Sequence, residues 1–344
     1  MHRGAFHGNA VPSNPWGIIM NKARLKPLVS LLLIFIAAPL LAALVTPWIY
    51  QAIQRQSPDV MDWVRSCEAA GTHLFWADIA DSIFTSPFRR VNDRLVLIFV
   101  LGLLWPAYRL SGLHGRADFG IPKRKDWARL FGSGLIVAAA SMLLVYLIGL
   151  LAGVYRPGEV GGDVVSELLK IIIGMLLVGV IEEILFRGYI LTALRKSLGA
   201  VPAILLSSAL FAAVHFIKPA SPEITNQWYS GFLLYGDLFA KAGDTFWPEV
   251  CTLFCMGTVL ATLSHWTRSV YITIGLHAGW VWIMMLFRLF TENQGRLVWL
   301  YGPGEWISKG WVGPLMALAV WAVVFSTRKK WIAMGQSFQT LEEK

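Results

Sequence analysis

The sequence predicts an all-α polytopic membrane protein, a bundle of about eight transmembrane helices. Hydrophobic residues make up 56% of its 344 residues and charged residues only 15%. The mean hydropathy is +0.57, and long uncharged runs recur from one end of the chain to the other. A soluble protein of this length could not bury so much apolar surface, so a membrane must cover part of it.

Apolar runs of about 17 or more residues mark the predicted helices. The first run is too long for the apolar part of a signal peptide and long enough to span, so we interpret it as a retained anchor. The second run, at 95–110, is short, and the fourth, at 165–195, is long. The predicted helices cover residues 28–50, 95–110, 130–154, 165–195, 200–217, 250–266, 269–290 and 311–327.

The positive charge bears on orientation. The formal net charge is +9, and in a membrane protein excess Lys and Arg mark cytoplasmic flanks and contacts with anionic lipid, not nucleic acid. With the N-terminus inside, most Lys and Arg outside the spans lie on the inner side. Five arginines of the first loop oppose this: Arg55, Arg65, Arg89, Arg90 and Arg94. We predict an integral protein of a bacterial inner (plasma) membrane with cytoplasmic N- and C-termini, contacts with the lipid bilayer and none with nucleic acid.

Four regions follow from this pattern. Residues 1–27 form a polar tail, and residues 28–164 hold the first transmembrane helices with an interfacial loop. Residues 165–290 form a core that contains the buried charges, and residues 291–344 hold the last transmembrane helix and a cytoplasmic tail. Within the core, the long connection at 218–249 is either a re-entrant or surface-lying helix or a partly ordered loop, and the sequence leaves both open.

Few titratable residues lie inside the predicted spans. They are Glu182, Glu183 and Arg187 within VGVIEEILFRGYI, His215 on the next helix, and His277 on the seventh. Each such charge costs about 2.5–3.5 kcal/mol in lipid, so their presence requires a reason. Glu183 and Arg187 have the spacing and order of an intrahelical ion pair. Glu182 is rotated by about 100° from Glu183 and can face a different neighbour.

These residues also share a depth. Counted from the inner helix ends at about 1.5 Å per residue, Glu182 lies about 20 Å deep, His215 about 23 Å and His277 about 14 Å. Boundary errors of about 2–4 residues make these depths compatible with one layer. Three helices would therefore present a carboxylate and two imidazoles to one another.

A carboxylate with two imidazoles can deprotonate a water and stabilise the oxyanion of a tetrahedral intermediate. The same groups can instead hold a divalent metal such as zinc that activates the water. Either arrangement hydrolyses an amide bond, and the sequence leaves both open. His-Glu-x-x-His is absent from the sequence, which excludes a zincin. A purely structural role, in which the polar groups hold helices together, is the alternative.

Three motifs on separate helices resemble one family. Glu182-Glu183-x-x-x-Arg187, then Phe211-x-x-x-His215, then IGLHAGW around His277 resemble the CPBP (ABI) family. That family contains the type II CAAX prenyl endopeptidases and bacteriocin-processing or self-immunity proteins. The resemblance covers about residues 165–290.

The resemblance implies an intramembrane endopeptidase that cleaves a membrane-associated or lipidated protein or peptide, with CAAX-type processing as the family activity. By position, Glu182 would be the water-activating residue, and His215 and His277 would be catalytic or metal-coordinating. The family has been described both as metal-dependent and as using a glutamate-activated water without metal. A set of His215, His277 and Glu182 holding zinc is therefore one expectation, and a metal-independent glutamate mechanism is the other.

The resemblance also implies supporting roles and shows one departure. Glu183 would be the structural companion of Glu182, held by Arg187, and Phe211 would pack beneath His215. The family often has Asn four residues after the last histidine, whereas this chain has Val281. An amide there could orient a ligand or donate to an oxyanion, and valine can do neither.

Two non-peptidase hypotheses stand beside this one. The first is a catalytically inactive scaffold or immunity factor of the same family, which Val281 favours. The second is a proton-coupled transporter, because intramembrane Glu and His side chains can relay protons. The sequence shows no evident repeat between its halves, which disfavours many transporter folds.

Overall fold

A computed structural model confirms the all-α membrane class. It describes residues 22–70, 75–161, 164–216, 227–235 and 243–342. In these ranges, sheet is confined to two short antiparallel strands, β1 (Tyr155–Pro157) and β2 (Thr291–Asn293). The strands tie the end of one long helix to the end of another, and everything that positions the buried charges is helical.

Helices occupy all eight of the predicted apolar runs. They are α1 (Lys22–Leu32), the π-helical η1 (Leu33–Ala37), α2 (Ala38–Ala69), α4 (Phe88–Leu110), α5 (Trp127–Leu151), α6 (Val164–Glu183), the π-helical η2 (Ile184–Ile190), α7 (Leu191–Leu198), α8 (Ala200–Phe216), α10 (Phe246–Thr267), α11 (Tyr271–Phe290) and α13 (Val312–Ser326). The remaining elements are α3 (Phe75–Phe84), α9 (Ser230–Leu233), α12 (Val298–Tyr301), the 3₁₀-helical η3 (Ile307–Lys309) and α14 (Arg328–Glu342).

The number of spans is lower than predicted. Within the described residues, six helices are long and apolar enough to cross a membrane, and a seventh is added if α13 and α14, bent by 62°, form one span. The prediction of about eight counted α8 as a full span. That helix has 17 residues, which is at the lower limit of what crosses an apolar core.

The first span is much longer than its apolar run. The helix is continuous over Leu25–Cys67, where the sequence predicted only residues 28–50. The segment predicted as an interfacial loop is therefore mostly helical, because α2 continues to Ala69 and α3 packs on it. Hydropathy detects only the apolar half of such a helix, and the charged residues that follow hide the remainder.

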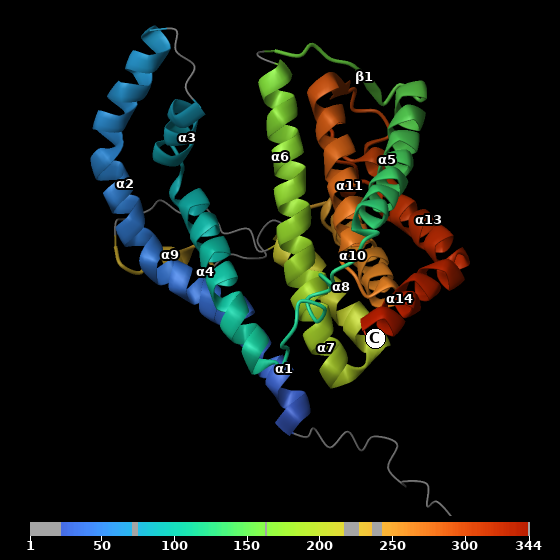
Figure 1. Ribbon diagram of the computed structural model, residues 1–344. Coiled ribbons are helices and arrows are strands. Elements are labelled where there is room, and N and C mark those ends of the chain that lie inside the picture. The colour runs from blue at the N-terminus through green and yellow to red at the C-terminus, as the bar shows by residue number, and fades with distance from the viewer. Residues whose placement is uncertain (1–21, 71–74, 162–163, 217–226, 236–242, 343–344) are drawn as a thin grey trace, which may run out of the picture.

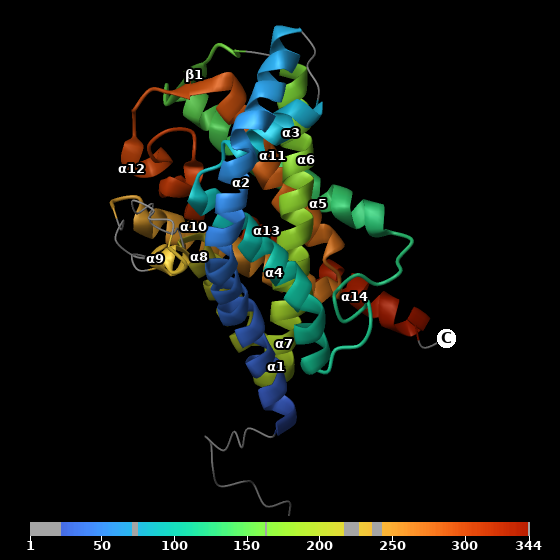
Figure 2. The same cartoon turned by 90° about the vertical axis from the view of Figure 1, so that its left-hand side faces the viewer.

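The helices form two groups that meet at one end of the molecule. In Figure 1, α2, α3 and α4 stand on one side, and α5, α6, α8, α10, α11 and α13 form the main bundle. The groups converge at the lower end, where α1 packs against α7. Figure 2 shows α1 and α7 at this same end from the perpendicular direction.

The closest helix pair in the bundle is α5 against α11. A Cβ on Gly275 would lie 2.0 Å from the carbonyl oxygen of Phe131, and one on Gly134 would lie 2.1 Å from that of Ile272. Only glycine permits such backbone contact, which is typical of small-residue packing between membrane helices. The contact fixes the position of His277, two residues after Gly275.

The connection predicted at 218–249 is only partly described. Residues 218–226 and 236–242 lie outside the described residues. Between them, α9 packs on α2 so closely that a Cβ on Gly231 would lie 1.9 Å from the carbonyl oxygen of Ala43. The connection ends where α10 begins at Phe246.

Candidate active site

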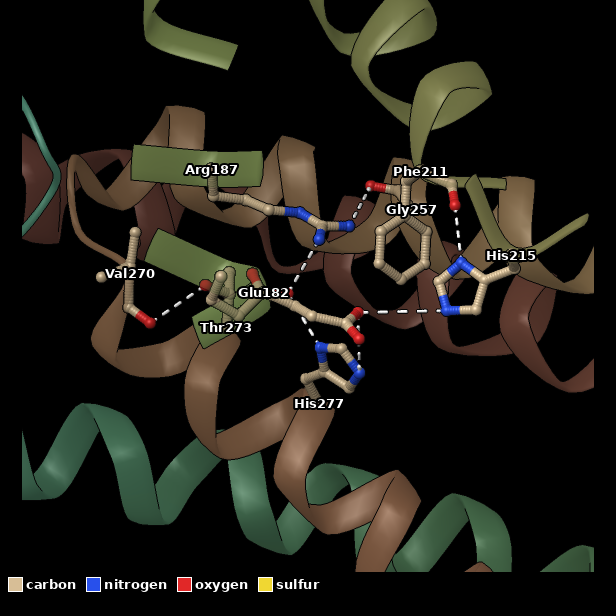
Figure 3. Close-up of polar contacts among 9 residues, drawn as sticks. Glu182, Arg187, Phe211, His215, Gly257, Val270, Thr273 and His277 are labelled. Carbon is tan, nitrogen blue, oxygen red and sulfur yellow. Dashed lines mark hydrogen bonds and ion pairs between the residues drawn. The ribbon is translucent and has the colours of Figure 1, made fainter. Parts of the chain in front are cut away.

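Three helices bring the buried ionisable residues together. Glu182 and Glu183 end α6, and Arg187 lies in the π-helical turn η2 that follows. His215 is on the last turn of α8, and His277 is near the middle of α11. Figure 3 shows the side chains of Glu182, His215 and His277 directed toward one another.

Glu183 is the charge-compensated member of the pair. Its side chain is 0% exposed, and Arg187 Nη1 donates to Glu183 Oε1 at 2.8 Å. The guanidinium also donates to the Gly257 carbonyl at 3.4 Å and lies over the Phe211 ring at 4.4 Å from its centroid. The predicted ion pair is thus formed, and its further hydrogen bond and ring contact offset the desolvation of a buried charge.

Glu183 also determines the protonation of His277. The Nδ1 atom of His277 lies 3.0 Å from Glu183 Oε1, an oxygen that can only accept when ionised. Nδ1 therefore bears the hydrogen and Nε2 keeps its lone pair in the neutral ring. The same logic applies to His215, whose Nδ1 lies 2.7 Å from the Phe211 carbonyl oxygen. Both rings are consequently oriented with unprotonated Nε2 atoms toward Glu182.

Glu182 faces both of these nitrogens. Its Oε2 atom lies 4.0 Å from His215 Nε2 and 3.9 Å from His277 Nε2. Neither separation is a hydrogen bond, and among the described residues this buried oxygen has no hydrogen-bond partner. The side chain is 29% exposed, unlike that of Glu183. A ligand bound between Glu182, His215 and His277 would contact all three side chains.

The donor chemistry fits a divalent metal. Two imidazole nitrogens and one carboxylate oxygen are a common zinc set, and hydrogen bonds at the opposite ring nitrogens orient such ligands. The spacing is wider than a coordination sphere, however. As placed, no group of three or more His, Cys, Asp or Glu in the described ranges could hold a metal ion.

The three groups open into an apolar cavity of about 190 Å³. Val281, one helical turn after His277, lines it, as do Thr252 on α10 and Ser308 on η3. The Thr252 hydroxyl lies 2.7 Å from the Pro248 carbonyl and 3.1 Å from the Ser308 carbonyl. Beyond Glu182 and the two imidazoles, the polar side chains of the cavity lining include a second carboxylate, Glu249 at the start of α10.

Sequence reasoning missed several of these features. The bond between Glu183 and His277 joins residues 94 positions apart, and no local spacing indicates it. Thr252 and Ser308 belong to elements whose packing the hydropathy pattern does not determine. The structure places His265 outside this cavity, on a second one with Arg195 and Arg268.

A comparison with protein families matches this part of the chain. Residues 164–283 fit the family model of the type II CAAX prenyl endopeptidase Rce1-like proteins. The match covers about a third of the chain and identifies an Rce1-like domain within it. The match begins with α6, ends within α11 and includes Glu182, His215 and His277, so the family predicted from the sequence is confirmed. No curated protein and no solved structure matched the chain.

Proposed function

We propose that this chain is an intramembrane endopeptidase in which Glu182 activates a water to hydrolyse a peptide bond. The observation that supports it best is the position of Glu182 Oε2, 3.9 Å and 4.0 Å from two imidazole nitrogens in an apolar cavity. The Rce1-like family supports a peptidase of the CAAX type. The substrate we propose is a membrane-associated or lipidated protein or peptide.

Glu182 has the properties of a general base. Its buried oxygen accepts no hydrogen bond from the described residues, so it is available to a water. The carboxylate would take a proton as the water oxygen attacks the carbonyl carbon, and would return that proton to the leaving amine. Glu183 is not placed to serve in this way, because its side chain is 0% exposed, does not line the cavity and is held at Oε1 by Arg187 and His277.

The two histidines act through Nε2. In the neutral tautomers fixed by Glu183 and the Phe211 carbonyl, Nε2 can accept a hydrogen bond. Glu182 takes one hydrogen of the attacking water, so only one ring can accept the other. Donation to the oxyanion requires a second hydrogen on the ring, which must be taken up from solution before the water attacks. Glu183 Oε1, bonded to His277 Nδ1, would hold His277 in place for this role, as an acid beside a catalytic histidine does in other hydrolases. We therefore assign the oxyanion to His277 and the second hydrogen of the water to His215.

A bound divalent metal is the second form of this proposal. Glu182, His215 and His277 would hold it, and the oriented lone pairs of both imidazoles support that set. When bound, a metal such as zinc would polarise the scissile carbonyl and make a bound water more acidic. Loss of cleavage on treatment with a chelator, restored by zinc, is the expected result for this form. Unchanged cleavage favours the metal-free form.

A lateral cavity supports a lipidated substrate. It has a volume of about 260 Å³ and is lined mainly by apolar side chains of η1, α4, η2 and α8, including Val96, Phe186 and Val214. Asp93 and Tyr235 are the polar members of the lining. Phe186 packs edge-on against Phe211 at 5.1 Å between ring centroids, and Phe211 lines the catalytic cavity. An aliphatic chain in the lateral cavity would thus lie beside the catalytic groups.

Replacing Glu182 by Gln tests the proposal. Since general acid–base catalysis contributes about 10²–10⁴-fold, cleavage should fall at least about 100-fold. Mapping new protein termini in the membranes of cells that express either form measures this loss and identifies the substrate. Glu167→Gln is the matched control, because Glu167 lies on the same helix, is 42% exposed and pairs with Lys170 near the start of that helix; this variant should cleave normally. Equal termini in wild-type and Glu182→Gln cells would refute the assignment.

Val281 makes a non-catalytic scaffold or immunity factor the second candidate. The amide that the family often places at this position is missing from the cavity wall. If the Glu182→Gln protein restores the phenotype of a deletion strain, the scaffold is favoured. If only the wild-type protein does so, catalysis is required.

A further inference from the structure

A second cavity lies at the end of the bundle that contains α7. Its volume is about 380 Å³. Its walls come from the loop after α4, from α7, from the start of α8 and from the turn between α10 and α11. The ionisable residues of its lining are Asp118, Arg187, Arg195, Lys196, His265 and Arg268.

The cations of this lining are poorly neutralised. Neither Arg195 nor Arg268 forms an ion pair in the described part of the chain, and the two charges lie close enough to repel each other. Lys196 donates to the Gly112 carbonyl at 2.8 Å, which leaves its charge uncompensated. The one acid, Asp118, accepts hydrogen bonds from the backbone of His114 and Gly115 in its own loop.

A further observation points to a ligand. The Nδ1 atom of His265 is buried and has no hydrogen-bond partner among the described residues. His265 lines the same cavity as Arg195 and Arg268. Arg268 is the C-cap of α10 with φ +54°, a left-handed conformation that is common where helices end.

The chemistry of the lining selects its ligand. Arginine side chains match phosphate oxygens in bidentate geometry, and lysine adds a point charge. Basic pockets between the cytoplasmic ends of membrane helices are suited to lipid headgroups. This cavity lies at the ends of α7 and α10, which the sequence predicts to be cytoplasmic.

We propose that this cavity binds a phosphoryl group, supplied by an anionic phospholipid headgroup or by free phosphate. Arg187 links it to the candidate active site, because Arg187 lines this cavity and its guanidinium is paired with Glu183, the neighbour of Glu182. For that reason Arg187 stays intact in the test, and binding is measured instead of cleavage. The result is then independent of the proposed peptidase activity.

The test follows the thermal unfolding of the full-length protein in a neutral detergent, using the fluorescence of its 16 tryptophans. Separate samples receive dioctanoyl phosphatidylglycerol, dioctanoyl phosphatidylcholine or inorganic phosphate. A ligand that binds the folded state raises Tm with concentration. We expect phosphatidylglycerol to raise Tm and phosphatidylcholine to have little effect.

Charge removal then locates the site. Arg195→Gln with Arg268→Asn should weaken phosphatidylglycerol binding at least tenfold; Asn is chosen because it tolerates the left-handed conformation. Lys329→Gln with Lys330→Gln is the control, because it removes the same charge from exposed positions on α14 outside the cavity. Should the double cavity variant not fold, Arg268→Asn alone in the exposed turn should still weaken binding severalfold.

The outcomes separate the ligand sources. A response to inorganic phosphate that equals the phosphatidylglycerol response, and is lost in the cavity variant, supports the site with free phosphate as its ligand. A response to phosphatidylglycerol alone supports the lipid headgroup. Equal binding by the cavity variant and the control variant, or an equal response to phosphatidylcholine, would overturn the proposal.

Discussion

Glu182 and Glu183 are adjacent in the chain, yet their carboxylates lie in different environments. Glu183 is fully buried between Arg187 and His277, and its charge is compensated. Glu182 is partly exposed to the cavity, and its Oε2 lacks a partner among the described residues. A rotation of about 100° per residue in a helix produces this division. Glu183 is thus held by its partners, and Glu182 is left for the role proposed for it.

Replacing Arg187 tests how much its ion pair with Glu183 stabilises the fold. Arg187→Met leaves Glu183 buried without compensation, so the free energy of unfolding should fall by about 3–5 kcal/mol. Glu182→Gln breaks no hydrogen bond or close ion pair with the described residues, and should change stability by less than about 1 kcal/mol. Denaturant titrations of both variants in detergent measure the difference. Comparable stability of Arg187→Met and wild type would contradict this account.

For single residues, the sequence predicts contacts between side chains on one helix but not contacts between side chains on different helices. The spacing of Glu183 and Arg187 predicts their ion pair, because residues four apart share a helix face. The contact of Glu183 with His277 depends on how α6 packs against α11. That packing depends on the bulk and shape of many side chains, which a spacing rule does not contain.

Val281 can be tested by restoring the amide. The Val281→Asn change adds a hydrogen-bond donor to the wall of the catalytic cavity, one turn after His277. Loss of one oxyanion donor costs about 10²–10³-fold in other hydrolases, so a donor added here should raise kcat by roughly tenfold. Val281→Leu, which adds bulk without a donor, is the control and should not increase the rate. A fall in kcat for Val281→Asn would mean that valine fits the transition state better than an amide.

Among the helices, the contact of α5 with α11 sets the geometry of the site. Gly134 and Ala138 on α5 face Gly275 and Gly279 on α11, two small-x-x-x-small pairs in opposition. His277 lies between the two glycines of α11, so any increase in helix separation moves its ring. Close backbone packing of this kind replaces the hydrophobic driving force, which is weak between helices in lipid.

A glycine-to-alanine pair tests this contact. In a helix interior, alanine is favoured over glycine by about 0.8–1.0 kcal/mol. Gly132→Ala on α5 has no atom within 4 Å of the new Cβ, so it should be neutral or stabilising. Gly134→Ala would place Cβ 2.1 Å from the Ile272 carbonyl oxygen, and overpacking should cost about 1–3 kcal/mol. Thermal unfolding and cleavage assays should show that Gly134→Ala lowers both stability and activity, whereas Gly132→Ala lowers neither. Equal stability and activity of the two variants would argue against the close packing of α5 on α11.

The helix boundaries show what apolar runs cannot predict. The run at 28–50 indicates a span, but the helix continues to Cys67 through charged residues that a hydropathy window excludes. The π-helical turn η2 follows Glu183 directly and has no hydropathy signal. Such turns are often found at functional sites, where they change the direction of side chains. Here the turn contains Arg187, which reaches both Glu183 and the α10 backbone.

Across the whole molecule, the short helix α8 explains the depth of the site. Its 17 residues extend about 26 Å, less than the roughly 30 Å apolar core of a bilayer. His215, on its last turn, therefore lies within the apolar thickness instead of at its surface. Glu182 lies near the middle of the 35-residue span Val164–Leu198. Glu182 and His215 are thus expected at a depth within the membrane, because α8 ends early beside a helix long enough to pass through.

The same dimensions allow the orientation to be tested. The α7 end of the bundle holds the cationic cavity, so the bias of Lys and Arg toward the cytoplasm predicts that this end faces inward. Gly115 and Gly161 are exposed at opposite ends, and each has room for a Cβ. After replacement of Cys67, Cys251 and Cys255, an impermeant maleimide should label Gly161→Cys in intact bacterial cells. Gly115→Cys should react only after lysis, and the reverse pattern would place the cationic cavity on the outer side.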